Sequence, residues 1–411
     1  MHHLLILITC PFLIPIDPAH ADDAPSFELL DGDRVVFIGN TFIERDQVYG
    51  YLETMLTARW PDRNITFRNL GWSGDTVWGE ARARFGTAAD GFQHLKEHVE
   101  AIKPTVVFVG YGTNESFEGE PGLTRFEKGL IALLEMLTAA SAPNARCALL
   151  SPIRQENVGA PAPDLGERNA ALRMYSDLIR RVAAARDHDF IGLYDMIPEQ
   201  RRSPVDRRLT DNGVHLNEFG YWTAADVITR SLGCSIRHRN TAISIGPDGI
   251  EPPNSGVALH NFEKTQSGCR FDLVADMLLP PRQPRETSRG RNISRPIFSR
   301  FANIAGLEPG MYEISRDGMP LTKTRSGQIM QVPADGRPTE QLRQAIIEKN
   351  RLYFHRWRPQ NETYLFGFRK HEQGQNAAEV PKFDPLVEEL EAKIAKLRVP
   401  VKHTYELIRQ E

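Results

Sequence analysis

Arg34-Val-Val-Phe-Ile-Gly-Asn-Thr-Phe-Ile-Glu-Arg45 is an apolar, β-branched run that ends at a glycine and two small polar residues. Such runs are typical of buried strands, and Gly39 permits a tight turn where the strand ends. From Arg34 to about Ser231, similar runs alternate with amphipathic stretches at helical spacing. This alternation predicts βαβ units, and therefore an α/β domain with a mostly parallel sheet.

The periodicity also places the individual elements of this domain. We expect strands at Arg34–Ile38, Ile65–Asn69, Thr105–Gly110, Arg146–Leu150 and Phe190–Tyr194. We expect helices at Gln47–Trp60, Gly91–Ala101, Gly122–Ala140, Gly166–Ala185 and Gly220–Ser231. Open α/β sheets bind ligands beyond the carboxyl ends of their strands, so the loops that follow these strands are where a site is expected.

The pattern changes after Ser231 to short strands broken by glycine and proline. Leu307–Gly318 alternates like a hairpin that ends in an Asp-Gly turn. Farther on, Gln341–Asn350 and Pro385–Leu397 have helical spacing, and the aromatic and basic residues between them either line a groove or clamp the tail onto the main domain. We therefore predict four parts, with bounds at 1–21, 30–235, 236–335 and 336–411.

The first part resembles a secretory signal peptide. Leu4–Ile16 is apolar and is followed by Ala19-His-Ala21, which matches an A-x-A cleavage site. Export to the periplasm or the medium is thus expected, with no membrane attachment after cleavage. In such a compartment Cys234 and Cys269 either form a disulfide or remain free buried thiols.

Composition limits the classes of partner. The chain has 411 residues, 41% hydrophobic and 25% charged, which is enough to bury a large core. Its formal net charge is −3, and charged residues of both signs are distributed along the sequence. This makes nucleic acid an improbable partner. No His/Cys spacing indicates a metal site, no cofactor motif is present, and the oligomeric state cannot be derived from the sequence.

Four segments carry the candidate chemistry. They are Phe37-Ile-Gly-Asn-Thr41, Asn69-Leu-Gly-Trp-Ser-Gly-Asp-Thr76, Gly110-Tyr-Gly-Thr-Asn114 and Asp211-Asn-Gly-Val-His215. A hydroxyl after the first strand is placed to attack a carbonyl, but it needs a neighbouring base. The alternative role of that segment is to cap the helix that follows it. The last segment offers His215 as the base, with Asp211 or Asn212 to orient the ring.

The second and third segments offer hydrogen-bond donors. The backbone N–H of Gly74 and the side-chain amide of Asn114 could meet at one substrate oxygen and form an oxyanion hole. Such donors are worth on the order of 3 kcal/mol each. The alternatives are ordinary turn geometry for the glycine and a loop-stabilising hydrogen bond for the asparagine.

Together the four segments resemble those of the SGNH hydrolases, also called GDSL-type esterases or lipases, over about residues 34–231. The resemblance implies a three-layer α/β/α, flavodoxin-like fold with a mostly parallel sheet, to which this chain adds a small β-rich region and a helical tail. It also implies a nucleophile at Thr41, oxyanion donors at Gly74 and Asn114, and a base at His215. The tail segments Trp357–Asn361 and Phe368–Gly374 look similar to extensions of exported SGNH-like proteins of the Planctomycetes group.

The chain departs from the family pattern at two reacting positions. The family has serine where this chain has Thr41, and aspartate where it has Asn212. Threonine keeps the hydroxyl but adds a methyl group beside it, and asparagine cannot offset the charge of an imidazolium. Asp211 could compensate by reaching the ring from one residue earlier.

Two functions follow. The first is a secreted esterase that hydrolyses an O-acyl ester, acetyl among the candidates, of a carbohydrate or small molecule. The second is a catalytically degenerate SGNH-fold protein that acts as a glycan-binding module. Retention of the oxyanion residues and of His215 favours the enzyme.

Overall fold

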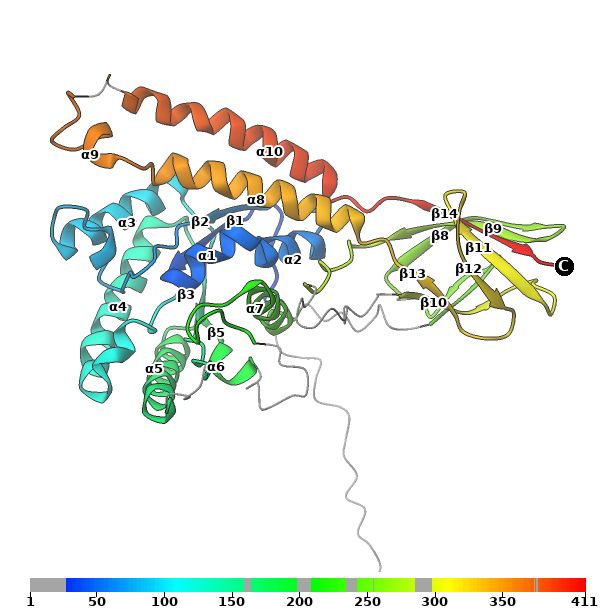
Figure 1. Ribbon diagram of the computed structural model, residues 1–411, viewed down its shortest axis with the longest axis horizontal. Helices are drawn as coiled ribbons and strands as arrows, with labels where there is room; N and C mark the ends of the chain where they lie inside the picture. Colours follow the sequence, from blue (N-terminus) through cyan, green and yellow to red (C-terminus); the bar gives the residue numbers. More distant parts are fainter. Residues whose placement is uncertain are drawn as a thin grey trace, which may run out of the picture.

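The structure is a computed structural model, which describes residues 27–158, 164–197, 208–233, 242–253, 255–284, 298–372, 374 and 376–411. Figure 1 shows an α/β domain, two long helices lying along it, and a β-sandwich at one end of the molecule. The proposed signal peptide and Cys234 lie outside the described residues. Among the described helices, none combines the length and the apolar composition that crossing a bilayer requires.

The α/β domain is built on one five-stranded parallel sheet with the order β2-β1-β3-β4-β5. This is the flavodoxin-like order, in which the chain reverses direction across the sheet between β1 and β3. The predicted three-layer α/β fold is thereby confirmed. The strands are β1 (Arg34–Gly39), β2 (Thr66–Asn69), β3 (Val106–Gly110), β4 (Arg146–Leu150) and β5 (Asp189–Ile191).

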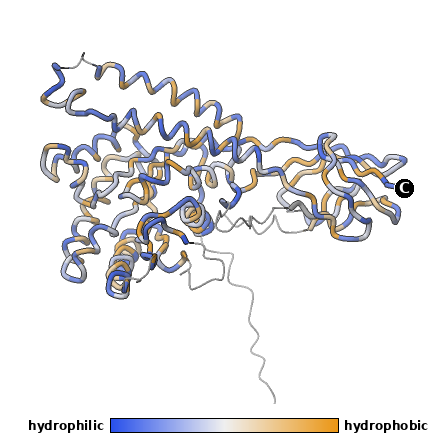
Figure 2. Tube along the Cα trace, in the orientation of Figure 1, coloured by the Kyte–Doolittle hydropathy of each residue, from blue (hydrophilic) through white to orange (hydrophobic). Residues whose placement is uncertain are grey.

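Residues of each strand alternate between two hydrophobic cores. In β1, Val35 and Phe37 face one core while Val36 and Ile38 face the other. A strand buried on both faces must be apolar at every position, which is why these runs are continuous rather than alternating. In Figure 2 the hydrophobic segments gather along the strands inside the α/β domain and inside the sandwich.

In the described part of the chain, helices cover both faces of this sheet. One core is closed by α1, α2 and α7, and the other by α3, α4 and α5. Their bounds are α1 (Thr41–Tyr49), α2 (Tyr51–Arg59), α3 (Ala88–Ile102), α4 (Leu123–Ala140), α5 (Gly166–Ala185) and α7 (Glu218–Ser231).

Helix α3 begins three residues before its predicted start, and two other elements of the α/β domain differ more substantially from the sequence prediction. The helix expected at Gln47–Trp60 is in fact the pair α1 and α2, because Gly50 adopts a left-handed conformation with φ of 64° and ends the first helix. The last strand is shorter than predicted. The chain turns into the short helix α6 (Leu193–Met196), where the Tyr194 backbone N–H donates to the Ser151 hydroxyl at 2.8 Å.

The sandwich consists of a four-stranded sheet, β13-β10-β6-β7, packed on a five-stranded sheet, β12-β11-β14-β9-β8. The predicted hairpin is confirmed as β11 and β12, joined at Asp317-Gly318. Cys269 in β9 is a fully buried free thiol. The strands are β6 (Ile243–Gly246), β7 (Gly249–Glu251), β8 (Val257–Thr265), β9 (Gly268–Ala275), β10 (Phe298–Ile304), β11 (Met311–Arg316), β12 (Met319–Arg325), β13 (Met330–Pro333) and β14 (His403–Arg409).

Between β13 and β14 the chain leaves the sandwich, runs along the α/β domain and returns; we call residues 337–397 the helical arm. It contains α8 (Arg337–Trp357), α9 (Glu362–Leu365), the 3₁₀ turns at Asn376–Lys382 and α10 (Phe383–Leu397). The segment expected to form one C-terminal extension is thus divided, since β14 pairs with β9 and β11 inside the sandwich. Helix α8 continues through Trp357 because that side chain is buried against the α/β domain.

Candidate active site

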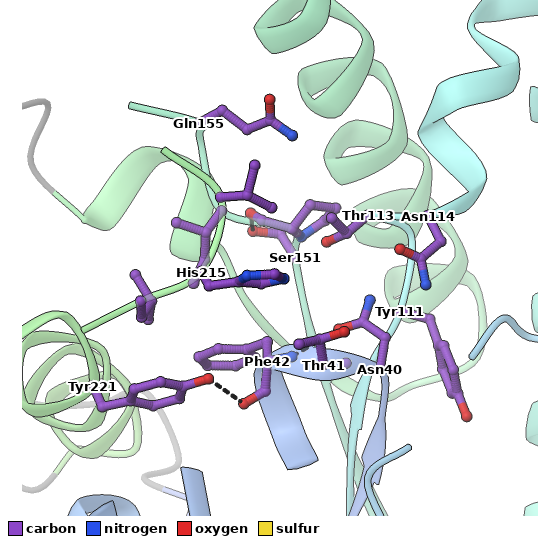
Figure 3. A pocket seen from close by; sticks show the side chains of 15 residues that line it. Asn40, Thr41, Phe42, Tyr111, Thr113, Asn114, Ser151, Gln155, His215 and Tyr221 are labelled. Carbon is purple, nitrogen blue, oxygen red and sulfur yellow. Dashed lines mark hydrogen bonds between the residues drawn. The ribbon is translucent and has the colours of Figure 1, made fainter. Parts of the chain in front are cut away.

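A cavity of about 70 Å³ opens at the carboxyl edge of the parallel sheet, beside the point where the chain reverses between β1 and β3. It brings together residues that follow three different strands, and Figure 3 shows their side chains converging. Asn40–Phe42 follow β1, Tyr111–Asn114 follow β3, and Ser151–Ile153 follow β4, while Val214–Leu216 and Tyr221 close the remaining side. Thr41, Asn114 and His215 therefore share one cavity.

Thr41 occupies the first position of α1. Asn40 caps that helix, because its side-chain oxygen accepts from the Phe42 backbone N–H at 3.1 Å. The capping role thus belongs to Asn40, and the Thr41 hydroxyl is left to face the cavity. The first N–H groups of a helix have no partner within the helix, so the Thr41 backbone N–H is a further donor that our sequence reasoning did not name. The sequence signal for this donor is that Thr41 directly follows Asn40, a residue type that often caps helices.

Of the two expected oxyanion donors, Gly74 contacts Thr41 and Asn114 lines the same cavity. The Gly74 backbone N–H donates to Thr41 Oγ1 at 3.3 Å, from a loop in which Gly74 has a φ of 80°. Asn114 donates one amide hydrogen to the Asp75 carbonyl oxygen at 2.7 Å. An amide nitrogen has two hydrogens, so the second remains for an oxygen bound in the cavity.

A buried polar network holds the two loops that carry these donors. Asp75 is fully buried and pairs with Arg82 at 2.6 Å, and it also accepts from the Tyr111 hydroxyl at 2.8 Å. Glu115 accepts from the Val77 and Gly112 backbone N–H groups, and burial raises the pKa of its carboxyl to about 7. Asp75 and Glu115 directly follow Gly74 and Asn114, which makes the network a scaffold for both loops.

The His215 ring is held by Asn212. The Asn212 side-chain oxygen accepts from the backbone N–H groups of Val214 and His215, at 3.2 and 2.9 Å. Because two donors fix that oxygen, the amide nitrogen faces His215 Nδ1, at 3.2 Å. Nδ1 therefore accepts the hydrogen bond, and a neutral ring carries its proton on Nε2.

Asp211 is directed elsewhere. It forms an ion pair with Arg45 at 3.4 Å, and in the described part of the chain it makes no hydrogen bond to the ring. Partial burial and the nearby Arg45 charge lower the pKa of His215 below its ordinary value, while Asp211 opposes this shift. Asn212, not Asp211, thus sets the orientation of the imidazole.

Thr41 and His215 line the same cavity without a direct hydrogen bond between their side chains. In unliganded active sites such contacts are often long and tighten only when substrate binds. No group of three or more His, Cys, Asp or Glu side chains in the described ranges is arranged to hold a metal ion.

Several solved structures are similar to this chain, and BT4096 superposes closely enough to show the same fold. BT4096, a gut microbial diltiazem-metabolizing enzyme, is 14% identical and superposes with a TM-score of 0.69 over 93% of this chain and 99% of its own. LAE5, an alpha/beta hydrolase from the metagenome of Lake Arreo, is 21% identical with a TM-score of 0.40, over 50% of this chain and 97% of its own. Axe2, an acetylxylan esterase from Geobacillus stearothermophilus, is 20% identical with a TM-score of 0.39, over 50% of this chain and 95% of its own.

No curated protein matches the chain in sequence. A family model does match, over residues 39–223, a span that includes Thr41, Gly74, Asn114 and His215. The matching model is that of the GDSL-like lipase/acylhydrolase family, so residues 39–223 are similar to the domain of that family.

Proposed function

We propose that this protein is an exported esterase that removes a short acyl group, such as acetyl, from a carbohydrate or another small alcohol. The observation that supports it most is the meeting of Thr41, His215 and Asn114 in one cavity, with the Gly74 N–H on the threonine oxygen. The cavity volume of about 70 Å³ favours a short acyl group. Sites for drug-sized ligands are usually several times larger.

In the proposed reaction the Thr41 oxygen attacks the ester carbonyl and its proton passes to His215 Nε2. The tetrahedral intermediate carries a negative oxygen that Gly74 and Asn114 stabilise. When the ester C–O bond breaks, the leaving alkoxide takes the proton back from Nε2. A water molecule then attacks the threonine ester by the same route, which releases the acid and restores Thr41.

The ring must first change tautomer, because only a free Nε2 can accept the threonine proton. In the other tautomer Nδ1 carries a hydrogen that would meet the hydrogens of the Asn212 amide. In the serine-protease triad an aspartate-to-asparagine exchange at the corresponding place lowers turnover about ten-thousand-fold. We therefore expect a slow enzyme.

The hydrogen bond from Asn212 to His215 Nδ1 also favours a second candidate function, a glycan-binding module without turnover. A ring that carries its proton on Nε2 is a hydrogen-bond donor into the cavity, which suits binding better than catalysis. Sugar hydroxyls and acyl oxygens could accept that bond.

Hydrolysis of p-nitrophenyl acetate and acetylated xylan by the full chain tests the proposal, with Thr41→Ala and His215→Ala beside it. Each replacement should lower kcat at least about a hundredfold, since each removes a group that takes part in bond making. Asp211→Asn is the matched control and should retain most activity. Equal, negligible rates in all four proteins, together with binding of acetylated xylo-oligosaccharides in calorimetry, would favour the binding module.

Export is tested separately. We expect the mature protein recovered from the periplasm or the medium to begin at Asp22, as read by mass spectrometry of its N-terminal peptide. An intact N-terminus in the recovered protein would contradict export by signal cleavage.

A further inference from the structure

The loop Gly71–Gly74, which carries an oxyanion donor, lies directly on the first turn of α1. A Cβ atom on Gly71 would stand 2.2 Å from the Glu44 backbone nitrogen, so the two segments touch without space for a side chain. The Trp72 backbone N–H donates to the Gly39 carbonyl at 2.9 Å. The position of the Gly74 N–H relative to Thr41 therefore depends on how firmly this loop is held against α1.

Glu44 holds the loop through its side chain. One carboxylate oxygen, Oε2, accepts from the Ser73 backbone N–H and also from Arg358 Nη1, the latter at 2.8 Å. Arg358 lies 314 residues from Glu44 in the chain and belongs to the helical arm. Both side chains are largely buried, with exposed fractions of 19% for Glu44 and 25% for Arg358. Partial burial strengthens a charge-assisted hydrogen bond compared with one in open solvent.

Arg358 also contacts the loop directly. Its guanidinium carbon lies 3.6 Å from the centroid of the Trp72 ring, the residue immediately before Ser73. The Trp72 ring packs edge-on against Trp357 at 5.9 Å. The stacked guanidinium limits both sliding and rotation of the Trp72 ring. A hydrogen bond alone would not limit both motions.

The arm is a firm support for these contacts. Arg358 follows directly on the last residue of α8, and Trp357 is almost fully buried. Helix α8 packs on α1, α2 and β2, and the arm begins and ends in the sandwich. Figure 1 shows α8 lying along the α/β domain, between that domain and α10.

We infer that Arg358 is a positioning residue for ester hydrolysis, and that through Glu44 and Trp72 the helical arm sets the geometry of the oxyanion hole. This inference rests on the proposed function. Arg358 has no contact with Thr41 or His215 among the described interactions, so its effect passes through the Gly74 N–H. A donor displaced by a fraction of an ångström stabilises the transition state less, because the substrate oxygen becomes charged there.

The test measures kinetics and amide exchange on the full chain. In Arg358→Ala we expect kcat for p-nitrophenyl acetate to fall at least about tenfold with KM within about twofold, because a transition-state interaction is lost. We expect hydrogen exchange of the Ser73 and Gly74 amides, followed by mass spectrometry, to accelerate at least about tenfold. Arg358→Lys keeps the charge near Glu44 without the planar stack, so it should recover part of both effects.

Arg356→Ala is the matched control. It breaks an ion pair with Asp384 at the same end of α8. Among the described interactions Arg356 has none with the loop, so both readouts should stay at wild-type values. Unchanged exchange in Arg358→Ala would overturn the inference, and so would faster exchange with unchanged kcat. A wild type that hydrolyses no ester would count against the proposed function instead, since the exchange data judge the contact independently of activity.

Discussion

At the scale of single residues, Asn212, three residues before His215, sets the hydrogen bonding of the imidazole ring. An asparagine there offers one acceptor and one donor, and two backbone N–H groups already occupy the acceptor. The donor is left for Nδ1, which sets the proton of the neutral ring on Nε2. A carboxylate in the same place would accept on both oxygens and reverse that preference.

Asn212→Asp should therefore increase activity. One carboxylate oxygen can keep the two backbone bonds while the other accepts from Nδ1–H, which frees Nε2 as the base and stabilises the imidazolium. We expect kcat for p-nitrophenyl acetate to rise by roughly a hundredfold, within the ten-thousand-fold effect known for this exchange. ¹⁵N NMR of His215 should report the change of tautomer. If the tautomer changes and kcat does not, His215 is not the base.

The pH dependence provides a second prediction at this scale. In the proposed reaction His215 is the base and must be neutral, so kcat/KM should rise with pH through the pKa of His215, which burial and Arg45 hold below its ordinary value. Arg45→Gln removes a repelling positive charge, raises that pKa and should move the acidic limb of the pH profile to higher pH. Asp211→Asn removes a negative charge and should move the limb in the opposite direction. Shifts of the same sign in both variants would contradict this account.

At the scale of elements, helix α8 is joined to the α/β domain by a buried ion pair. Lys349 and Glu53 are almost fully buried and lie 2.6 Å apart, and Lys349 also donates to the Phe67 carbonyl oxygen at 3.1 Å. Asn350 donates to the other Glu53 oxygen at 3.0 Å. The Lys349, Asn350 and Glu53 side chains are thus all paired, which favours one position of the helix on α2 and β2.

Lys349→Met should destabilise the protein strongly. It leaves the Glu53 carboxylate buried without its cation, and breaking such a pair costs about 3–5 kcal/mol. Replacing both partners, Lys349→Met with Glu53→Leu, should recover most of that loss because no uncompensated charge remains. Urea unfolding measures both. Arg356→Met, which breaks a partly exposed pair on the same helix, should cost no more than about 1 kcal/mol. Equal losses in the single and double variants would refute the pairing argument.

At the scale of the whole molecule, the last strand joins the parts together. β14 lies in the middle of the five-stranded sheet, between β9 and β11, and it follows directly after the helical arm. Its Tyr405 and Leu407 side chains belong to the sandwich core. The arm is thus anchored in the sandwich at both ends while its middle lies on the α/β domain.

Deleting residues 403–411 should disrupt the sandwich. The deletion leaves the facing edges of β9 and β11 unpaired and opens the core, which a sheet does not tolerate. Differential scanning calorimetry should show loss of the sandwich transition, and exchange in α10 should accelerate because one anchor is gone. Ile408→Ser, at an exposed position of the same strand, should change little. A truncated chain with unchanged transitions would contradict this role of β14.

Much of the fold could be predicted from local sequence patterns. Four of the five predicted sheet strands match within one residue at each end, as Arg146–Leu150 shows, because a buried run and its glycine boundary are local properties. The meeting of Thr41, Asn114 and His215 also followed, since parallel strands bring their carboxyl ends to one edge. The break at Gly50 was missed because the apolar spacing continues across it while the backbone does not.

The amino-acid sequence by itself determined the α/β class, the edge at which the candidate site lies and the residues that line its cavity, because these depend on periodicity and on short segments. Only the tertiary structure decided which ring nitrogen of His215 holds a proton, that Asp211 turns to Arg45, and that Arg358 supports the Gly74 loop. These depend on the exact direction of a hydrogen bond or on contacts between distant parts of the chain. No local pattern encodes either, since both are settled when the packed layers limit each polar group to the partners within its reach.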